Sequence, residues 1–296
     1  MQVLKRYGWL VAAIVVFAAG FAVATAWDLA IDQAVYHVNG FGILMESLGW
    51  YPAFLPPIAL LALWAVRGQR GFLLPARRVW QRCVCALVAA GGLVALYLVS
   101  RNYMVKRGWL SGTAAGVAWL AAGVLFAVIL FAAVWRATPN AAIKLAFLAL
   151  WGTVLTVANQ AVVYPLKTLW QRTRFDDMLA AGSFEAFTPW YRPLGAGGSS
   201  FPSGHTANAA VIFCLLVLCD ISPALHRRRR WVLAACWAYV AAMAAARILI
   251  GRHFLSDTLA AAGIMALLLF FLRRTRPYQK MVQKARAALA GGDDAI

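Results

Sequence analysis

The sequence predicts an all-α fold, a polytopic bundle of transmembrane helices with about eight spans. Of the 296 residues, 63% are hydrophobic and only 13% are charged, whereas a soluble domain is nearer to half apolar and a quarter charged. Many apolar runs approach the ~20 residues that a helix needs to cross a bilayer. These runs show no alternation of apolar and polar residues, which favours helices over a membrane barrel.

Eight apolar segments are candidate spans, and they cover residues 8–27, 51–66, 83–100, 114–135, 141–164, 205–222, 231–250 and 254–272. The second is short and carries Pro56 and Pro57, which makes it the weakest of the eight. The N-terminal run resembles a signal peptide, but it is long enough to span and seven further spans follow. We therefore expect a retained signal anchor.

The basic charge of the chain has a distribution typical of membrane orientation. A net charge of +18 could indicate a nucleic-acid partner. With the N-terminus inside, however, most of the 28 Lys and Arg fall on inside segments, including Arg70, Arg77, Arg78 and the run at 227–230. The positive-inside rule explains this balance. We expect no nucleic-acid partner and both termini on the cytoplasmic side.

The remaining segments offer little chemistry by themselves. The five cysteines fall inside apolar spans and are interpreted as small hydrophobic residues, not as a disulfide framework or a metal site. Residues 28–50 are predicted on the outer side of the membrane, and they carry Asp28, Asp32 and Glu46. This segment could lie along the membrane surface. The longest polar segment, 165–204, is glycine-rich near its end, and a loop of that length is usually functional or disordered.

Polar residues gather at the predicted outside ends of four spans, in three clusters. The clusters are Lys167 and Arg174 after the fifth span, Pro202 to His205 opening the sixth, and Arg247, His253 and Asp257 around the seventh and eighth. Because all these ends lie on one side of the membrane, we expect one site assembled from distant segments.

Five of these residues suit phosphate binding. Lys167, Arg174 and Arg247 are cations near a hydrophobic boundary. An Arg fork matches phosphate oxygens bidentately, and Lys adds a compact charge. Ser203 and Gly204 stand where a helix begins, and there free N–H groups favour an anion while Gly permits its close approach.

Three residues suit nucleophilic and acid–base chemistry. His253 and Asp257 are four residues apart, so on a helix they would share one face. The carboxylate could take the Nδ1 proton and leave Nε2 of His253 as a nucleophile. His205 could donate a proton to a leaving alkoxide. The set indicates phosphoryl transfer without a metal, and no cofactor is expected.

Three motifs in these clusters resemble the signatures of the type 2 phosphatidic acid phosphatase (PAP2) superfamily. They are Lys167-x6-Arg174, Pro202-Ser203-Gly204-His205 and Arg247-x5-His253-x3-Asp257. The resemblance extends from residue 167 to residue 257. Phe175 and Ala246 stand where the family usually has proline and serine, and neither replaces a proposed charged or catalytic group.

The resemblance implies an integral membrane lipid phosphatase. His253 would attack phosphorus and form a phosphohistidine, Asp257 would orient it, and His205 would protonate the leaving group. The phosphoryl oxygens would be held by Lys167, Arg174, Ser203, Gly204 and Arg247.

The resemblance also implies a six-helix core with two extra spans before residue 141. We expect N-terminal membrane segments at 1–140, catalytic helices and active-site loops at 141–276, and a cytoplasmic tail at 277–296. The site would face the periplasmic side of a bacterial inner membrane. The substrate would be a lipid phosphate in the bilayer, and the sequence does not choose among undecaprenyl diphosphate, phosphatidylglycerophosphate and phosphatidate.

Two other functions are compatible with parts of the pattern. A lipid phosphotransferase would use the same phosphohistidine and would need an acceptor lipid. A non-enzymatic transporter could have eight spans with charged edges, but it would not explain the two histidines together with the aspartate.

Other ionisable residues receive a structural or solvent-facing interpretation, namely His37, His226, Arg172, Arg252, Asp176 and Asp177.

Overall fold

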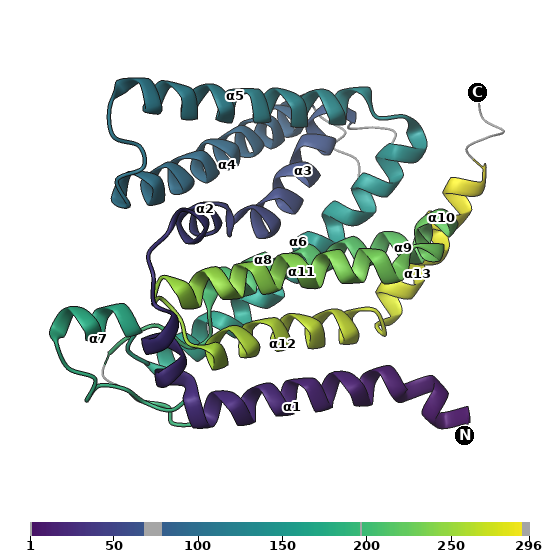
Figure 1. Ribbon diagram of the computed structural model, residues 1–296. Helices are drawn as coiled ribbons and strands as arrows, with labels where there is room; N and C mark the ends of the chain where they lie inside the picture. Colours follow the sequence, from purple (N-terminus) through teal and green to yellow (C-terminus); the bar gives the residue numbers. More distant parts are fainter. Residues whose placement is uncertain (1, 68–78, 196, 292–296) are drawn as a thin grey trace.

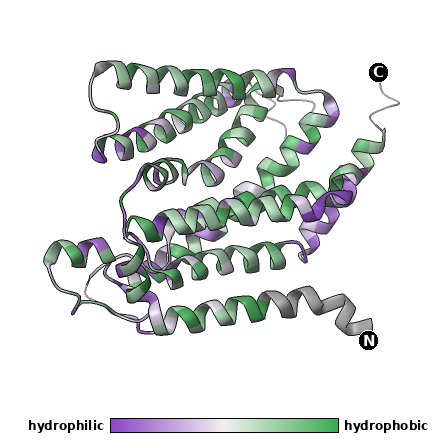
Figure 2. Ribbon diagram, in the orientation of Figure 1, coloured by the Kyte–Doolittle hydropathy of each residue, from purple (hydrophilic) through white to green (hydrophobic). Residues whose placement is uncertain are grey.

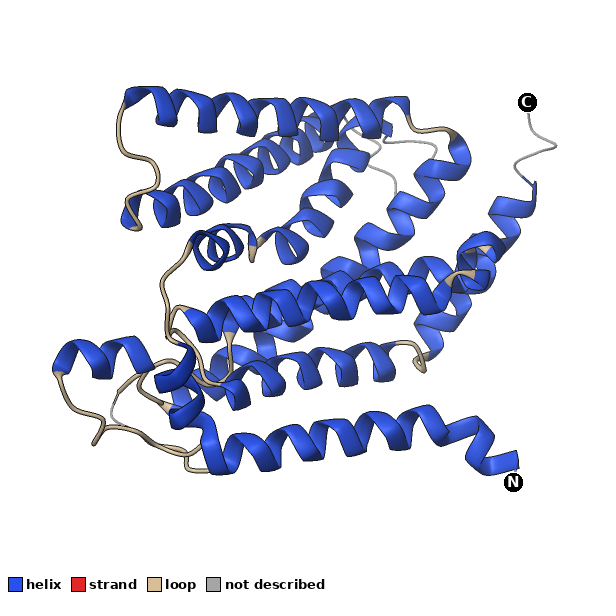
Figure 3. Cartoon of the chain, in the orientation of Figure 1, coloured by secondary structure: helices blue, strands red, loops and turns tan. Residues whose placement is uncertain are grey.

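The computed structural model describes residues 2–67, 79–195 and 197–291 (Figure 1). Within these ranges every regular element is a helix (Figure 3), which confirms the all-α prediction. The first half of the chain contains α1 (Gln2–Val35), α2 (Gly40–Leu48), α3 (Tyr51–Arg67), α4 (Val79–Lys106), α5 (Thr113–Arg136) and α6 (Pro139–Trp170). The second half contains α7 (Phe175–Ala181), α8 (Gly204–Ala210), the 3₁₀-helix η1 (Val211–Val217), α9 (Leu218–Ile221), α10 (Pro223–Arg227), α11 (Arg229–Leu249), α12 (Leu255–Leu272) and α13 (Arg276–Ala290).

Eight helical segments of the described chain are long and apolar enough to cross a membrane. They confirm a polytopic helical bundle, but several differ in extent from the sequence prediction, most of all the second and the fifth, which is Pro139–Ala181. The second span is Gly40–Val66, because α2 and α3 run almost without interruption into each other. Pro56 and Pro57 are accommodated inside α3.

The spans run back and forth, so their ends gather at two opposite ends of the bundle (Figure 1). The C-terminal ends of α6 and α11 and the N-terminal ends of α8 and α12 meet near α7. The cytoplasmic end predicted from the charges holds α10 and α13. Figure 2 shows polar residues concentrated at these two ends, with apolar residues along the helices between them. The expectation that all three motifs share one end is confirmed.

The segment α8–η1–α9 forms the centre of the bundle. It contacts α6, α11 and α12. In this span 72% of the residues of the apolar stretch are buried inside the protein, whereas the corresponding share for the outlying α5 is 6%. Cys214 and Cys219 lie in this core with Cys236, and all five cysteines are free. Their interpretation as small hydrophobic residues agrees with this burial.

The segment at 28–50 is mostly helical. Helix α1 continues through Asp28 and Asp32 to Val35, and α2 follows at Gly40. The carboxylate residues Asp28, Asp32 and Glu46 are all buried. The sequence did not predict this burial, because polar residues were taken to mark the end of a span, whereas these carboxylates lie in the protein interior.

The polar segment 165–204 is largely ordered around the end of α6. Gln171 adopts a left-handed conformation and donates its N–H to the Lys167 carbonyl. The chain then returns beside this turn, since Gly198 N–H donates to the Gln171 carbonyl and Ser200 N–H to the Arg172 carbonyl, both at 2.8 Å. A Cβ on Gly198 would lie 2.2 Å from the Arg172 carbonyl oxygen, so the close approach requires glycine.

The predicted tail after residue 276 begins as helix α13. Its apolar residues Tyr278, Val282 and Ala285 are buried, and the helix packs against α6 and α9. Arg70, Arg77, Arg78 and residues 292–296 lie outside the described residues.

Candidate active site

The three motifs line one cavity of about 680 Å³ at the α7 end of the bundle. Of the predicted site residues, those that line it are Lys167, Arg174, Gly204, His205, Arg247 and His253. Asp257 and Ser203 are fully buried behind its wall. The structure therefore brings the predicted clusters together, with six residues at the surface of the cavity and two in the layer behind it.

The PSGH motif builds the start of α8. Ser203 is the N-cap, and its Oγ accepts the Thr206 N–H at 3.3 Å and lies 2.9 Å from Thr206 Oγ1. The hydroxyl of Ser203 thus stabilises the helix start and is not among the groups that line the cavity. Gly204 follows, and a Cβ there would approach Lys167 Cε to 3.3 Å.

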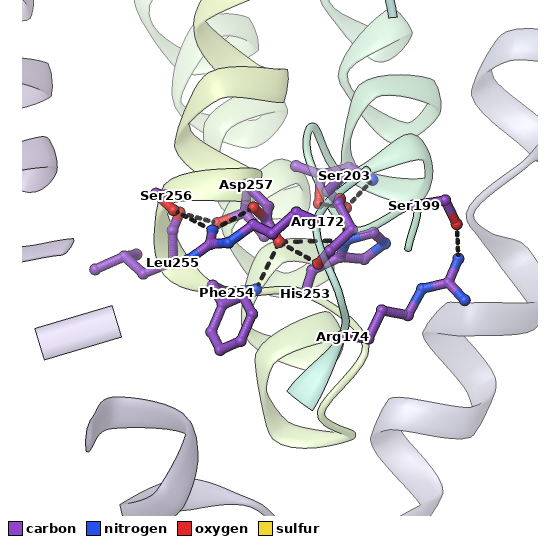
Figure 4. Close-up of polar contacts among 12 residues, drawn as sticks. Arg172, Arg174, Ser199, Ser203, His253, Phe254, Leu255, Ser256 and Asp257 are labelled. Carbon is purple, nitrogen blue, oxygen red and sulfur yellow. Dashed lines mark hydrogen bonds and ion pairs between the residues drawn. The ribbon is translucent and has the colours of Figure 1, made fainter. Parts of the chain in front are cut away.

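The first motif is anchored to Ser199 of the returning loop. Lys167 Nζ donates to the Ser199 carbonyl, and Arg174 Nη2 donates to Ser199 Oγ, each at 2.7 Å (Figure 4). The loop therefore holds both cations toward the same cavity. Arg174 lies directly before α7 and is its N-cap residue.

Arg247, in the last turn of α11, is only 2% exposed. Its Nη1 lies 2.9 Å from Glu46 Oε1, and Arg107 Nε donates to Glu46 Oε2 at 2.9 Å. Glu46 of α2 therefore compensates two buried or half-buried guanidinium groups. This contact was not predicted, because nothing in the sequence relates residue 46 to residue 247.

Several donors of the cavity have no hydrogen-bond partner among the described residues. They are the Nε atoms of Arg174, Arg247 and Arg252, which are buried. Burying such donors unpaired is costly. The same three arginines border the cavity, and guanidinium groups bind phosphate oxygens with charge-assisted hydrogen bonds.

The nucleophile candidate differs from the prediction in its surroundings. Helix α12 begins only at Leu255, so His253 precedes the helix and does not share a helical face with Asp257. Its Nδ1 donates to the Ser200 carbonyl at 2.8 Å and lies 3.7 Å from Asp257 Oδ2. Since a carbonyl only accepts, the proton resides on Nδ1, and Nε2 is left as the nitrogen that can attack.

Burial lowers the pKa of His253 well below its usual value of 6.5, and the neighbouring charges of Lys167 and Arg247 act in the same direction. The hydrogen-bonding influence of Asp257 opposes them. The imidazole is therefore neutral near pH 7, which is the form that a nucleophile needs.

His205 lies between two aromatic residues of the N-terminal half. Trp50 Nε1 donates to His205 Nε2 at 3.2 Å, and the Tyr103 ring makes an edge contact with a centroid separation of 5.3 Å. Trp50, Tyr103 and Glu46 all line the cavity. Residues before position 141 thus contribute directly to the site.

Two charged residues given a structural interpretation lie at the site. Arg252 lines the cavity and donates to Asp176 Oδ2 at 2.9 Å. Arg172 is fully buried and bonds to Asp257 at 2.7 Å. Its role was missed because Asp257 lies 85 positions away in the sequence.

Residues 146–281 match the family model of the PAP2 superfamily, and this match supports membership of that superfamily. The match begins within α6 and ends within α13, so it contains every predicted site residue. At the level of reaction class, the match supports an enzyme of the phosphatase or phosphotransferase type. No curated protein and no solved structure matches the chain.

Proposed function

We propose that this protein hydrolyses a lipid phosphate monoester or diphosphate through a phosphohistidine at His253. The observation that carries the proposal is the hydrogen bond from His253 Nδ1 to the Ser200 carbonyl, because it fixes the tautomer with Nε2 free. The same cavity holds His205 and the cations Lys167, Arg174 and Arg247.

In the first step, His253 Nε2 attacks phosphorus and the bond from phosphorus to the leaving oxygen breaks. His205, in its imidazolium form, gives a proton to that oxygen. The leaving group departs as a lipid alcohol from a monoester or as a lipid monophosphate from a diphosphate. The cations stabilise the charge on the nonbridging oxygens. The phosphorylated imidazolium carries positive charge, which the buried carboxylate of Asp257 stabilises from 3.7 Å.

In the second step, His205 accepts a proton from water, and the water oxygen attacks phosphorus. The bond from phosphorus to Nε2 breaks, inorganic phosphate is released, and His253 returns to its neutral form. Trp50 Nε1 donates to His205 Nε2 in this structure and so orients the neutral form of the ring, which is the form that accepts a proton from water. The imidazolium form carries a proton on Nε2 and therefore releases this hydrogen bond.

The lining of the cavity supports a lipid substrate. Val163, Tyr164 and Thr168 of α6 belong to the wall, and the Tyr164 side chain is 57% exposed on the outside of a membrane-spanning helix. A substrate phosphate in the cavity would thus lie close to the surface that faces the bilayer, where its acyl or isoprenyl chains would remain.

Phosphate release by the detergent-purified protein tests this proposal. The panel consists of undecaprenyl diphosphate, phosphatidylglycerophosphate and phosphatidate, each offered alone and with an excess of a second lipid alcohol. We expect release of inorganic phosphate without the alcohol. Transfer of label to the added alcohol, with no release in its absence, would instead identify a phosphotransferase.

Turnover should be insensitive to chelation. Lys167, Arg174 and Arg247 already place positive charge around the phosphate, so an excess of EDTA is expected to leave the rate of phosphate release unchanged. The rate is measured before and after incubation with EDTA and again after adding magnesium. Inactivation by EDTA that magnesium reverses would show that the reaction requires a metal.

The site should face the periplasm of a bacterial host. Ser183 is exposed beside α7 and Lys280 is exposed on α13 at the other end, so single cysteines at these positions report the two sides. In intact cells, a membrane-impermeant maleimide is expected to label the Ser183→Cys variant above the wild-type background. Labelling of the Lys280→Cys variant should need permeabilised cells, and the reverse pattern would place the site in the cytoplasm.

A further inference from the structure

Behind the cavity, Arg172 lies between two buried carboxylates from distant parts of the chain. Its Nη1 is 2.7 Å from Asp257 Oδ1, and its Nη2 is 2.9 Å from Asp28 Oδ2. The three side chains have exposures of 0%, 0% and 2%. Asp28 comes from α1, which precedes the segment that matches the family model.

Every direction around the Arg172 guanidinium is occupied. Its Nε donates to the Thr188 carbonyl at 2.7 Å, and its plane packs on the Phe254 ring at 4.1 Å from the centroid. Ser256 joins the two ends of the cluster. Its hydroxyl accepts from Arg172 (Figure 4). The same hydroxyl donates to Asp28 Oδ2, and the Ser256 N–H donates to Asp28 Oδ1. The orientation of this arginine is therefore fixed.

This cluster also fixes Asp257. With Arg172 on Oδ1, the other oxygen, Oδ2, accepts from Ser200 Oγ at 2.5 Å and from Phe254 N at 2.9 Å. Ser200 is the residue whose carbonyl accepts the Nδ1 proton of His253. A chain of contacts thus runs from α1 through Arg172 and Asp257 to the proposed nucleophile.

The charges of the cluster suit the proposed intermediate. Asp257 must remain ionised in a fully buried position to stabilise an imidazolium, and an isolated buried carboxylate is strongly disfavoured. Arg172 supplies the compensating charge. Asp28 adds a second carboxylate to the same guanidinium, so the cluster contains one cationic and two acidic side chains, and their excess of negative charge suits a cationic imidazolium at His253.

We propose that Arg172 and Asp28 are positioning residues for the nucleophile, acting through Asp257 and Ser200. The inference rests on the proposed function, in which His253 attacks phosphorus. It assigns to α1 a part in catalysis that the family motifs do not contain. Neither residue lines the cavity, so neither is expected to bind the substrate phosphate.

The test compares Arg172→Gln, Arg172→Lys and Asp28→Asn with the wild type. We expect kcat per folded molecule to fall about 10- to 100-fold in Arg172→Gln, as for other residues that orient a catalytic group, while KM changes little. Arg172→Lys should recover part of this loss. Asp28→Asn, which preserves shape, should lower kcat in the same direction by a smaller factor and carries the test if Arg172→Gln does not fold.

A matched control separates positioning from general stability. Arg273 forms an ion pair with Asp220 at the opposite end of the bundle, so Arg273→Gln also loses a partly buried ion pair. Its kcat per folded molecule should equal that of the wild type. An unchanged kcat in both Arg172→Lys and Asp28→Asn, or an equal loss in Arg273→Gln, would overturn the inference.

Binding of orthovanadate distinguishes a failure of the inference from a failure of the proposed function. This phosphate-shaped anion can take a histidine nitrogen as its fifth ligand, so it reports the placement of His253 without turnover. We expect the Arg172 and Asp28 variants to bind it more weakly than the wild type and than Arg273→Gln. If no lipid phosphate is hydrolysed but this difference is found, the positioning role stands and the proposed reaction falls. Equal binding by all variants would overturn the positioning role.

Discussion

Replacing His253 with Asn abolishes phosphate release from every lipid phosphate that the wild type hydrolyses. The Asn amide can still donate to the Ser200 carbonyl, which His253 Nδ1 contacts at 2.8 Å, but it has no nucleophilic nitrogen. Removal of a nucleophile typically costs about 10⁶-fold in kcat. We expect a loss of at least this order, measured as phosphate released per folded molecule.

His226 provides the matched control. Its Nδ1 contacts the Cys219 carbonyl at 3.2 Å in the predicted cytoplasmic part of the bundle, so His226→Asn makes the same chemical change away from the cavity. This variant should retain wild-type turnover. If His253→Asn keeps turnover within tenfold of the wild type, another group forms the bond to phosphorus.

Replacing His205 with Gln produces a loss that depends on the leaving group. The Gln oxygen can accept from Trp50, as His205 Nε2 does now, but the side chain cannot transfer a proton. General acid–base catalysis contributes about 10²- to 10⁴-fold, so kcat for a lipid alkyl phosphate should fall by this factor. An aryl phosphate, whose phenolate leaves without protonation, should still phosphorylate His253 rapidly.

The second step should then become visible, because His205 is also the base that activates water. With an aryl phosphate, the His205→Gln variant is expected to release one phenol per active site in a burst, followed by slow turnover. Stopped-flow absorbance at the phenolate band measures both phases. No burst, together with an equal loss for alkyl and aryl substrates, would remove His205 from both proton transfers.

The bundle and most of its chemistry could be predicted from composition and motif spacing. Apolar run length gives the spans, because a membrane permits few alternatives to a helix. The alternating direction of the spans then brings Lys167, His205 and Arg247 to one end without any knowledge of packing. Ser203 and Gly204 open α8 as expected, since a serine before an apolar run is a typical helix N-cap.

The remaining features depend on tertiary contacts that leave no local pattern. Trp50 contacts His205, which is 155 residues away in the sequence, and Asp28 contacts Arg172, which is 144 residues away. The spacing of His253 and Asp257 is compatible with a helix, but α12 begins two residues after His253. The carbonyl that fixes His253 belongs to Ser200, and a backbone acceptor cannot be recognised from side-chain identity.

The most direct test of the account is to trap the phosphorylated enzyme. The protein is mixed with a lipid phosphate labelled at its terminal phosphate, quenched in alkali within one turnover, and digested for mass spectrometry. Alkali preserves a phosphoramidate and destroys an acyl phosphate. The account predicts label on the peptide that contains His253, and accumulation of label in the His205→Gln variant when a labelled aryl phosphate replaces the lipid. Label on another residue, or turnover with no labelled protein under these conditions, would contradict it.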